Sequence, residues 1–136
     1  MSQNTKRREA LNWYEGALVD LEEAEDALSG ARPNWALFAS HQAVEKALKA
    51  AHIVLKRQRP PRTNDLVELY RNLGVELSEE LNEALSELTP YYSVARYPNA
   101  GLERPWLGIS RSLARRLFEA SKKITEEVGV SANLRG

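Results

Sequence analysis

The sequence contains no cysteine and only two histidines, His41 and His52. The absence of cysteine excludes disulfide bonds, thiolate metal ligands and a cysteine nucleophile. The two histidines lie about three turns apart on one expected helix, too far to share a metal ion, so no metal site is expected. No apolar run is long enough to cross a bilayer, and the polar, basic first ten residues lack the apolar segment of a secretory signal. We therefore expect a cytoplasmic protein without a membrane anchor, a metal or a cofactor.

An excess of charge of either sign is also absent, since 19 basic and 19 acidic residues give a formal net charge of zero. The charges are nevertheless sorted along the chain. Residues 1–28 and 63–90 are acidic overall, whereas residues 29–62 and 91–136 are basic. In an antiparallel bundle this alternation can pair neighbouring helices through exposed ion pairs, which are common and individually weak. A functional basic face is the alternative interpretation.

Apolar residues recur at spacings of three, four and seven, as is typical of amphipathic helices, and glycine or proline separates the periodic segments. The pattern predicts helices at about residues 7–28, 35–57, 65–73, 78–89 and 110–128. The expected fold class is all-α, an antiparallel up-and-down bundle of about five helices. With 136 residues the chain fits a single domain with one hydrophobic core. We place this core at about residues 5–130 and a flexible tail at 131–136.

The helix at residues 35–57 carries two stripes of different character. The apolar stripe consists of Leu37, His41, Val44, Leu48, Ala51 and Leu55, and the stripe of small residues consists of Ala36, Ser40, Ala43, Ala47, Ala50 and Val54. Small residues let neighbouring helices approach closely, so we expect this helix to be central. Because His41 falls in the apolar stripe, we interpret it as a hydrogen-bonded core histidine.

Local signals give further expectations for helix ends and faces. Asn34, Thr63 and Ser78 can each accept a backbone N–H in the first turn of the helix that follows, so they are predicted N-caps. In the first helix the predicted buried face consists of Leu11, Tyr14, Leu18, Leu21 and Leu28. The chain from Gly129 onward is expected to fray.

A long segment, residues 91–108, is rich in aromatic residues, proline and glycine, and loops of this kind are often functional. Arg96 could clamp a phosphate with two hydrogen bonds, or it could tie down the loop by bonding backbone carbonyls. Tyr92 and Tyr97 could stack on a base, or they could pack the loop onto the bundle. On the central helix, Glu45 and Lys49 stand four residues apart, the spacing of an ordinary solvated pair.

Three stretches closely resemble the HEPN domain family. Residues 41–50 match its Ala-rich helix with Gln, Glu-Lys and Lys, and residues 63–66 are similar to its Thr-His-Asp-Leu helix start. Residues 91–100 are close to its Tyr-Tyr and Thr-Arg-Tyr-Pro-Asp segment. The resemblance covers roughly residues 5–130 and implies an α-helical bundle that pairs as a homodimer. Many such domains accompany a minimal nucleotidyltransferase in toxin–antitoxin pairs.

The sequence departs from the family's RNase motif, in which Arg is followed after four to six residues by His. After Arg96 those positions hold Gly101, Leu102 and Glu103, and no histidine occurs beyond His52. Asn64 and Asn99 also replace the family's usual His and Asp. These changes remove a proton-transfer group and a negative charge, which favours binding an anion over cleaving one.

The resemblance therefore implies a non-catalytic module that binds a nucleotide or RNA phosphate. Its expected ligand-binding residues are Arg96, Tyr97, Asn99, Lys49, Glu45, Tyr92 and Asn64, and no catalytic residue is expected. One alternative is a metal-independent RNase toxin that uses Arg96 with Glu45 or another polar group in place of the missing histidine. Another alternative is a scaffold that only dimerises and neutralises a partner.

Overall fold

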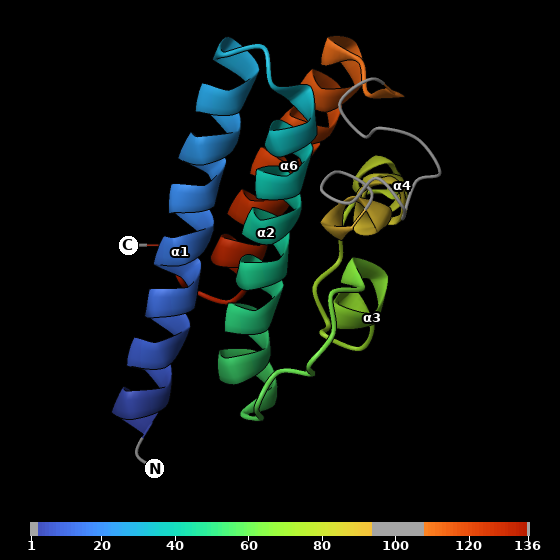
Figure 1. The fold of residues 1–136 in the computed structure, drawn as a ribbon. Helices are drawn as coiled ribbons and strands as arrows, with labels where there is room; N and C mark the ends of the chain where they lie inside the picture. Colours follow the sequence, from blue (N-terminus) through green and yellow to red (C-terminus); the bar gives the residue numbers. More distant parts are fainter. Residues whose placement is uncertain (1–2, 94–107, 136) are drawn as a thin grey trace.

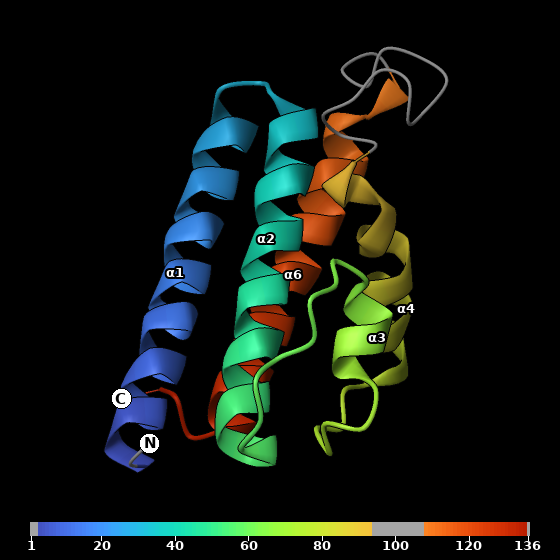
Figure 2. The same cartoon turned by 60° about the horizontal axis from the view of Figure 1, so that its bottom comes forward.

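A computed structural model describes residues 3–93 and 108–135, and all regular structure within these residues is helical (Figure 1). The elements are α1 (Gln3–Ser29), α2 (Pro33–Ala51), the π-helical turn η1 (His52–Lys56), α3 (Leu66–Tyr70), α4 (Glu79–Leu88), the 3-10 turn η2 (Thr89–Tyr92) and α6 (Arg111–Ser131). The all-α prediction is thus confirmed. Helices α1 and α4 run in one direction and α2 and α6 in the other, which gives an up-and-down arrangement (Figures 1 and 2).

Helix α2 is central, as its sequence predicts. It packs against α1, α6, α3 and η2. All members of its small stripe except Val54 are buried, and so are all members of its apolar stripe except Leu55. Both stripes are therefore used within the chain, and the large apolar side chain that α2 leaves exposed is Trp35, at 45%.

The buried face of α1 differs from the prediction. Leu11 and Leu18 are 37% and 43% exposed, whereas Ala10, Ala17 and Ala24 are fully buried. The small residues of α2 meet the small residues of α1, and two helices in such close contact have no room for leucine between them. Leu11 and Leu18 therefore lie outside, whereas Tyr14 and Leu28 of the predicted face are buried.

One of the predicted caps is confirmed and two are wrong. The Ser78 hydroxyl accepts the N–H of Leu81 and so caps α4, and Ser110 caps α6 in the same way through the N–H of Leu113. Asn34 instead lies buried inside the first turn of α2, because Pro33, with its fixed φ, starts that helix two residues earlier than predicted.

The cap of α3 is Asp65 rather than Thr63. The Asp65 carboxylate accepts the N–H groups of Val67 and Glu68, while the Thr63 hydroxyl accepts the N–H of Asp65. A carboxylate accepts two such bonds and is also favoured by the helix dipole, so it displaces the hydroxyl.

The chain beyond Gly129 does not fray where the sequence suggests. Helix α6 continues to Ser131, and Leu134 is only 3% exposed. Asn133 adopts a positive φ of 54°, and the N–H of Leu134 then bonds the carbonyl of Gly129 at 2.8 Å. The tail expected at 131–136 is therefore packed as far as the described residues extend.

The alternation of charge along the chain does pair neighbouring helices. Lys46 of α2 lies 2.9 Å from Asp20 of α1, and Arg116 of α6 lies 2.7 Å from Glu87 of α4. Each pair joins an acidic segment to a basic one. None of the described helices combines the length and apolar character that a membrane span requires.

Candidate functional site

Four of the predicted site residues lie around His41, on the side of α2 that faces the start of α3 and η2. His41 is fully buried, and its Nε2 lies 3.0 Å from the backbone oxygen of Asn64. A carbonyl oxygen only accepts, so Nε2 carries the hydrogen. The ring of Tyr92 lies 5.7 Å from the His41 ring, at a tilt of 46°. The interpretation of His41 as a hydrogen-bonded core residue is confirmed.

Glu45 lies one turn further along α2 and is only 7% exposed. Its Oε2 accepts a hydrogen bond from Lys49 Nζ at 3.0 Å, and its Oε1 lies 3.7 Å from His41 Nδ1. The Lys49 ammonium also lies 5.7 Å from the centre of the Trp13 ring of α1. The spacing of four predicted this ion pair, but the pair lies largely inside the bundle and not on a solvated face.

The two histidines of the chain lie at different places but in similar surroundings: each is buried and hydrogen-bonded to a backbone carbonyl. Burial lowers the pKa of His41, against the opposing effects of the Glu45 carboxylate and the Asn64 carbonyl. Burial also lowers the pKa of His52, whose Nε2–H donates to the Leu69 carbonyl at 3.1 Å. Both rings are therefore neutral at pH 7 and are oriented by backbone carbonyls.

The remaining predicted site residues, Arg96, Tyr97 and Asn99, lie outside the described residues. Among the described residues, no three His, Asp or Glu side chains come close enough to hold a metal ion.

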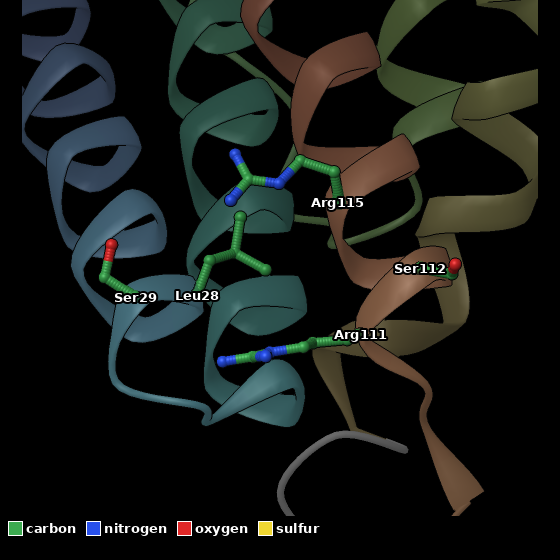
Figure 3. A pocket seen from close by; sticks show the side chains of 5 residues that line it. All are labelled: Leu28, Ser29, Arg111, Ser112 and Arg115. Carbon is green, nitrogen blue, oxygen red and sulfur yellow. The ribbon is translucent and has the colours of Figure 1, made fainter.

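A second charged region was not predicted from the sequence. At the start of α6, Arg111 and Arg115 line a pocket of about 420 Å³ together with Leu28 and Ser29 from the end of α1 and with Ser112 (Figure 3). The available signal was the density of arginine at residues 111–116, which contain three. The proximity of the end of α1 depends on the tertiary fold.

The fold and the buried polar cluster define an all-α domain with a central helix whose polar residues face η2 and the start of α3. The sequence pattern of the HEPN domain matches residues 10–131, which is most of the chain. The chain therefore belongs to the HEPN domain family.

Two crystal structures share this fold. The protein TT1696 from Thermus thermophilus has a TM-score of 0.80 and 31% identity, over 89% of this chain and 96% of that one. ST0689, an archaeal HEPN homologue, has a TM-score of 0.74 and 23% identity, over 90% of this chain and 97% of that one. No match was found among curated proteins.

Proposed function

We propose that this HEPN-domain protein is a binding module and not a nuclease. It holds a phosphate of a nucleotide or of RNA near Arg96, forms a homodimer and pairs with a minimal nucleotidyltransferase. The observation that carries the non-catalytic assignment is that both histidines of the chain are used inside the fold.

A histidine that transfers protons to a substrate needs a ring nitrogen within hydrogen-bond reach of that substrate. His41 and His52 are buried, and each donates its Nε2–H to a backbone carbonyl. No other histidine exists in the sequence. The metal-independent reaction that relies on Arg and His therefore lacks its proton-transfer group.

For the anion, we assign the main contact to Arg96. The Lys49 ammonium is held by Glu45 at 3.0 Å and its side chain is only 14% exposed, so we give it a supporting role. Glu45, Lys49 and Tyr92 then support the site from within the bundle, through their contacts with one another and with His41. Because the side chain of Glu45 is largely enclosed and bonded to Lys49, it is also a poor general base, which disfavours the RNase alternative.

We place the homodimer interface on the outer face of α1. Leu11 and Leu18 are exposed there, one on each side of Glu15. The first part of α1 is basic, with three positive charges at residues 6–8, and its last part is acidic at residues 22–26. A second copy docked antiparallel on this face brings opposite charges together over the two leucines, and sedimentation near 30 kDa, twice the 15.3 kDa chain mass, would support it. Leu18→Asp should give the monomer, and an unchanged dimer would place the interface elsewhere.

The ligand assignment is tested by titrating the protein with ATP and with a short single-stranded RNA at low salt. Arg96→Lys keeps the charge but removes the planar fork, and should weaken binding by about 1 to 3 kcal/mol. The same RNA, incubated with wild type and with Arg96→Ala, should stay intact in both samples. Cleavage that disappears in Arg96→Ala would establish the RNase alternative. No binding by wild type would favour the scaffold.

A further inference from the structure

The pocket at the start of α6 combines two cations with an apolar floor. Arg111 and Arg115 stand one turn apart on the helix, and both guanidinium groups extend toward the end of α1. Figure 3 shows them on opposite sides of the Leu28 side chain, while the Ser112 hydroxyl points away from the gap. Leu28 is buried, so it forms the floor between the two charges.

The positive charges of these two arginines are little neutralised by neighbouring carboxylates. Within the described part of the chain, Arg111 has no carboxylate within 4.0 Å, and Arg115 has only Glu119, at 3.8 Å and half exposed. By contrast, the neighbouring Arg116 makes two hydrogen bonds to Glu87, at 2.7 and 3.2 Å. Arg111, the first residue of α6, also stands where the dipole of that helix is positive, which disfavours its charge further.

The end of α1 does not account for the two guanidinium groups either. The carbonyls of Asp26 and Ala27 accept the backbone N–H groups of Gly30 and Arg32, and among the described residues neither arginine of the pocket is hydrogen-bonded to a carbonyl of this helix end. A third cation lies near them: a Cβ added at Gly30 would come within 2.9 Å of Arg32 Nη1. Three arginines therefore gather at this end of the bundle, just beyond the acidic residues 22–26 of α1.

From this arrangement we propose that the Arg111–Arg115 pocket is a second anion site, which takes the phosphate groups of a phosphate ester. A guanidinium presents paired donors that match phosphate oxygens, and two of them flank an apolar floor. A ligand with phosphates on either side of a nucleoside fits this pattern, because its less polar part then lies over Leu28. The inference extends the proposed function, since both invoke phosphate, but it depends on different residues.

The test is a titration of the full chain with inorganic phosphate, with ATP and with a ten-nucleotide single-stranded RNA, at several salt concentrations. The variants are Arg111→Ala/Arg115→Ala, Arg111→Lys/Arg115→Lys, Arg96→Ala and, as the matched control, Arg116→Ala. A glutamate peptide with the same net charge as the RNA serves as a further ligand. It distinguishes recognition of phosphate from a general attraction of the two arginines for acidic groups. Circular dichroism and urea unfolding show whether each variant is folded.

The alanine double variant should weaken RNA binding at least tenfold. The slope of the logarithm of the binding constant against the logarithm of the salt concentration should become shallower by about 1.4, or about 0.7 for each lost phosphate contact. The lysine variant should recover only part of this affinity, and Arg116→Ala should bind like wild type. The relative strength of phosphate, ATP and RNA then identifies the form of the ester.

Four outcomes would overturn the inference. If Arg116→Ala and the alanine double variant lost the same RNA affinity, the effect would be one of net charge alone. If the glutamate peptide bound as tightly as RNA, the pocket would bind acidic groups in general and not phosphate. A loss confined to Arg96→Ala would refute this pocket and leave the proposed function standing. Absence of all binding by wild type would refute both.

Discussion

The polar interior beside α2 and the basic surface at the start of α6 handle charge in opposite ways. Inside, Glu45 is enclosed, and both of its oxygens face cation-capable groups: Lys49 at 3.0 Å and His41 at 3.7 Å. On the surface, Arg111 faces no carboxylate among the described residues, and Arg115 faces only an exposed one. The Glu45 carboxylate is paired inside the bundle, whereas the guanidinium groups of Arg111 and Arg115 remain accessible to a ligand.

This difference separates two kinds of residue that the family pattern groups together. Lys49 belongs to the family-like helix and was expected to touch the ligand, yet its contacts are internal. Arg111 belongs to no motif that the sequence displayed, yet it lines a pocket. We therefore expect the position of a cation relative to neighbouring helices, and not its place in a motif, to indicate whether it can meet a ligand.

The largest expected effect comes from breaking the interior pair. Lys49→Met keeps most of the apolar stem but leaves Glu45 buried without its cation, and should lower the free energy of unfolding by about 2 to 4 kcal/mol. Urea denaturation measures this loss. Arg116→Met is the surface control, because Arg116 and Glu87 are both well exposed, and its unfolding midpoint should barely move.

A second variant separates packing from charge at the same site. The double substitution Glu45→Gln/Lys49→Met removes both charges, and should recover at least half of the stability lost in Lys49→Met. If the double variant were less stable than Lys49→Met alone, the Lys49 stem and not its charge would support this region.

The next largest effect on stability should come from substitution of a helical glycine by alanine, which we compare at Gly129 in the interior and at Gly16 nearer the surface. A Cβ at Gly129 would overlap the Tyr14 hydroxyl, which donates to the Thr125 carbonyl at 2.9 Å. A Cβ at Gly16 would meet only the flexible Lys46 side chain, at 3.3 Å. Gly129→Ala should therefore cost about 1 to 3 kcal/mol, although alanine normally favours a helix.

Gly16→Ala is the matched control for helix propensity and should be neutral or stabilising by up to about 1 kcal/mol. Thermal unfolding of the two variants compares them directly. Equal stabilisation by both substitutions would mean that α6 does not press against Tyr14 as the structure indicates.

Much of the fold could be predicted because local chemistry and packing agree. The serines at Ser78 and Ser110 and the proline after Thr89 mark real helix ends, and the two stripes of α2 match its central place. The buried face of α1 could be predicted only in part, at Tyr14 and Leu28, since its alanine and leucine stripes are both apolar. Only the close approach of α2 selects the alanines.

The candidate site divides in the same way. The pairing of Glu45 with Lys49 follows from their spacing on one helix, but their burial depends on the elements that cover α2. The Arg111–Arg115 pocket requires the end of α1 to lie beside the start of α6, and no local pattern encodes that contact. Sequence periodicity reports which residues share a face, and tertiary contacts decide what the face meets.

The smallest expected effect is a dependence of stability on pH, in which the interior and the surface titrate in different windows. Burial holds the pKa of His41 below its ordinary value of 6.5, so its contribution to stability is complete above pH 6.5 and is lost as the pH falls toward the folded-state pKa. On the surface, hydrogen bonding to Arg116 lowers the pKa of Glu87 below 4.5, so that pair weakens only in more acidic solution. Urea midpoints should therefore fall modestly between pH 7 and 5, before any loss at the surface.

The groups that face His41 make this prediction sharper. The Tyr92 ring of η2 lies against the His41 ring, and the Asn64 carbonyl accepts the Nε2–H. Within the described residues, the charge that acts on the His41 pKa is the Glu45 carboxylate, which opposes the effect of burial, and Gln42 and the Thr89 backbone act in the same direction as Glu45. Replacing Glu45 with glutamine removes that opposition, so the pKa of His41 should fall further in Glu45→Gln. Nuclear magnetic resonance titration of the ring protons follows both histidines separately, and His52, which has no facing carboxylate among the causes of its shift, should be unaffected. A wild-type pKa of His41 above 6.5 would show that Glu45 outweighs burial, and the interior cluster would then be a charged pair at neutral pH.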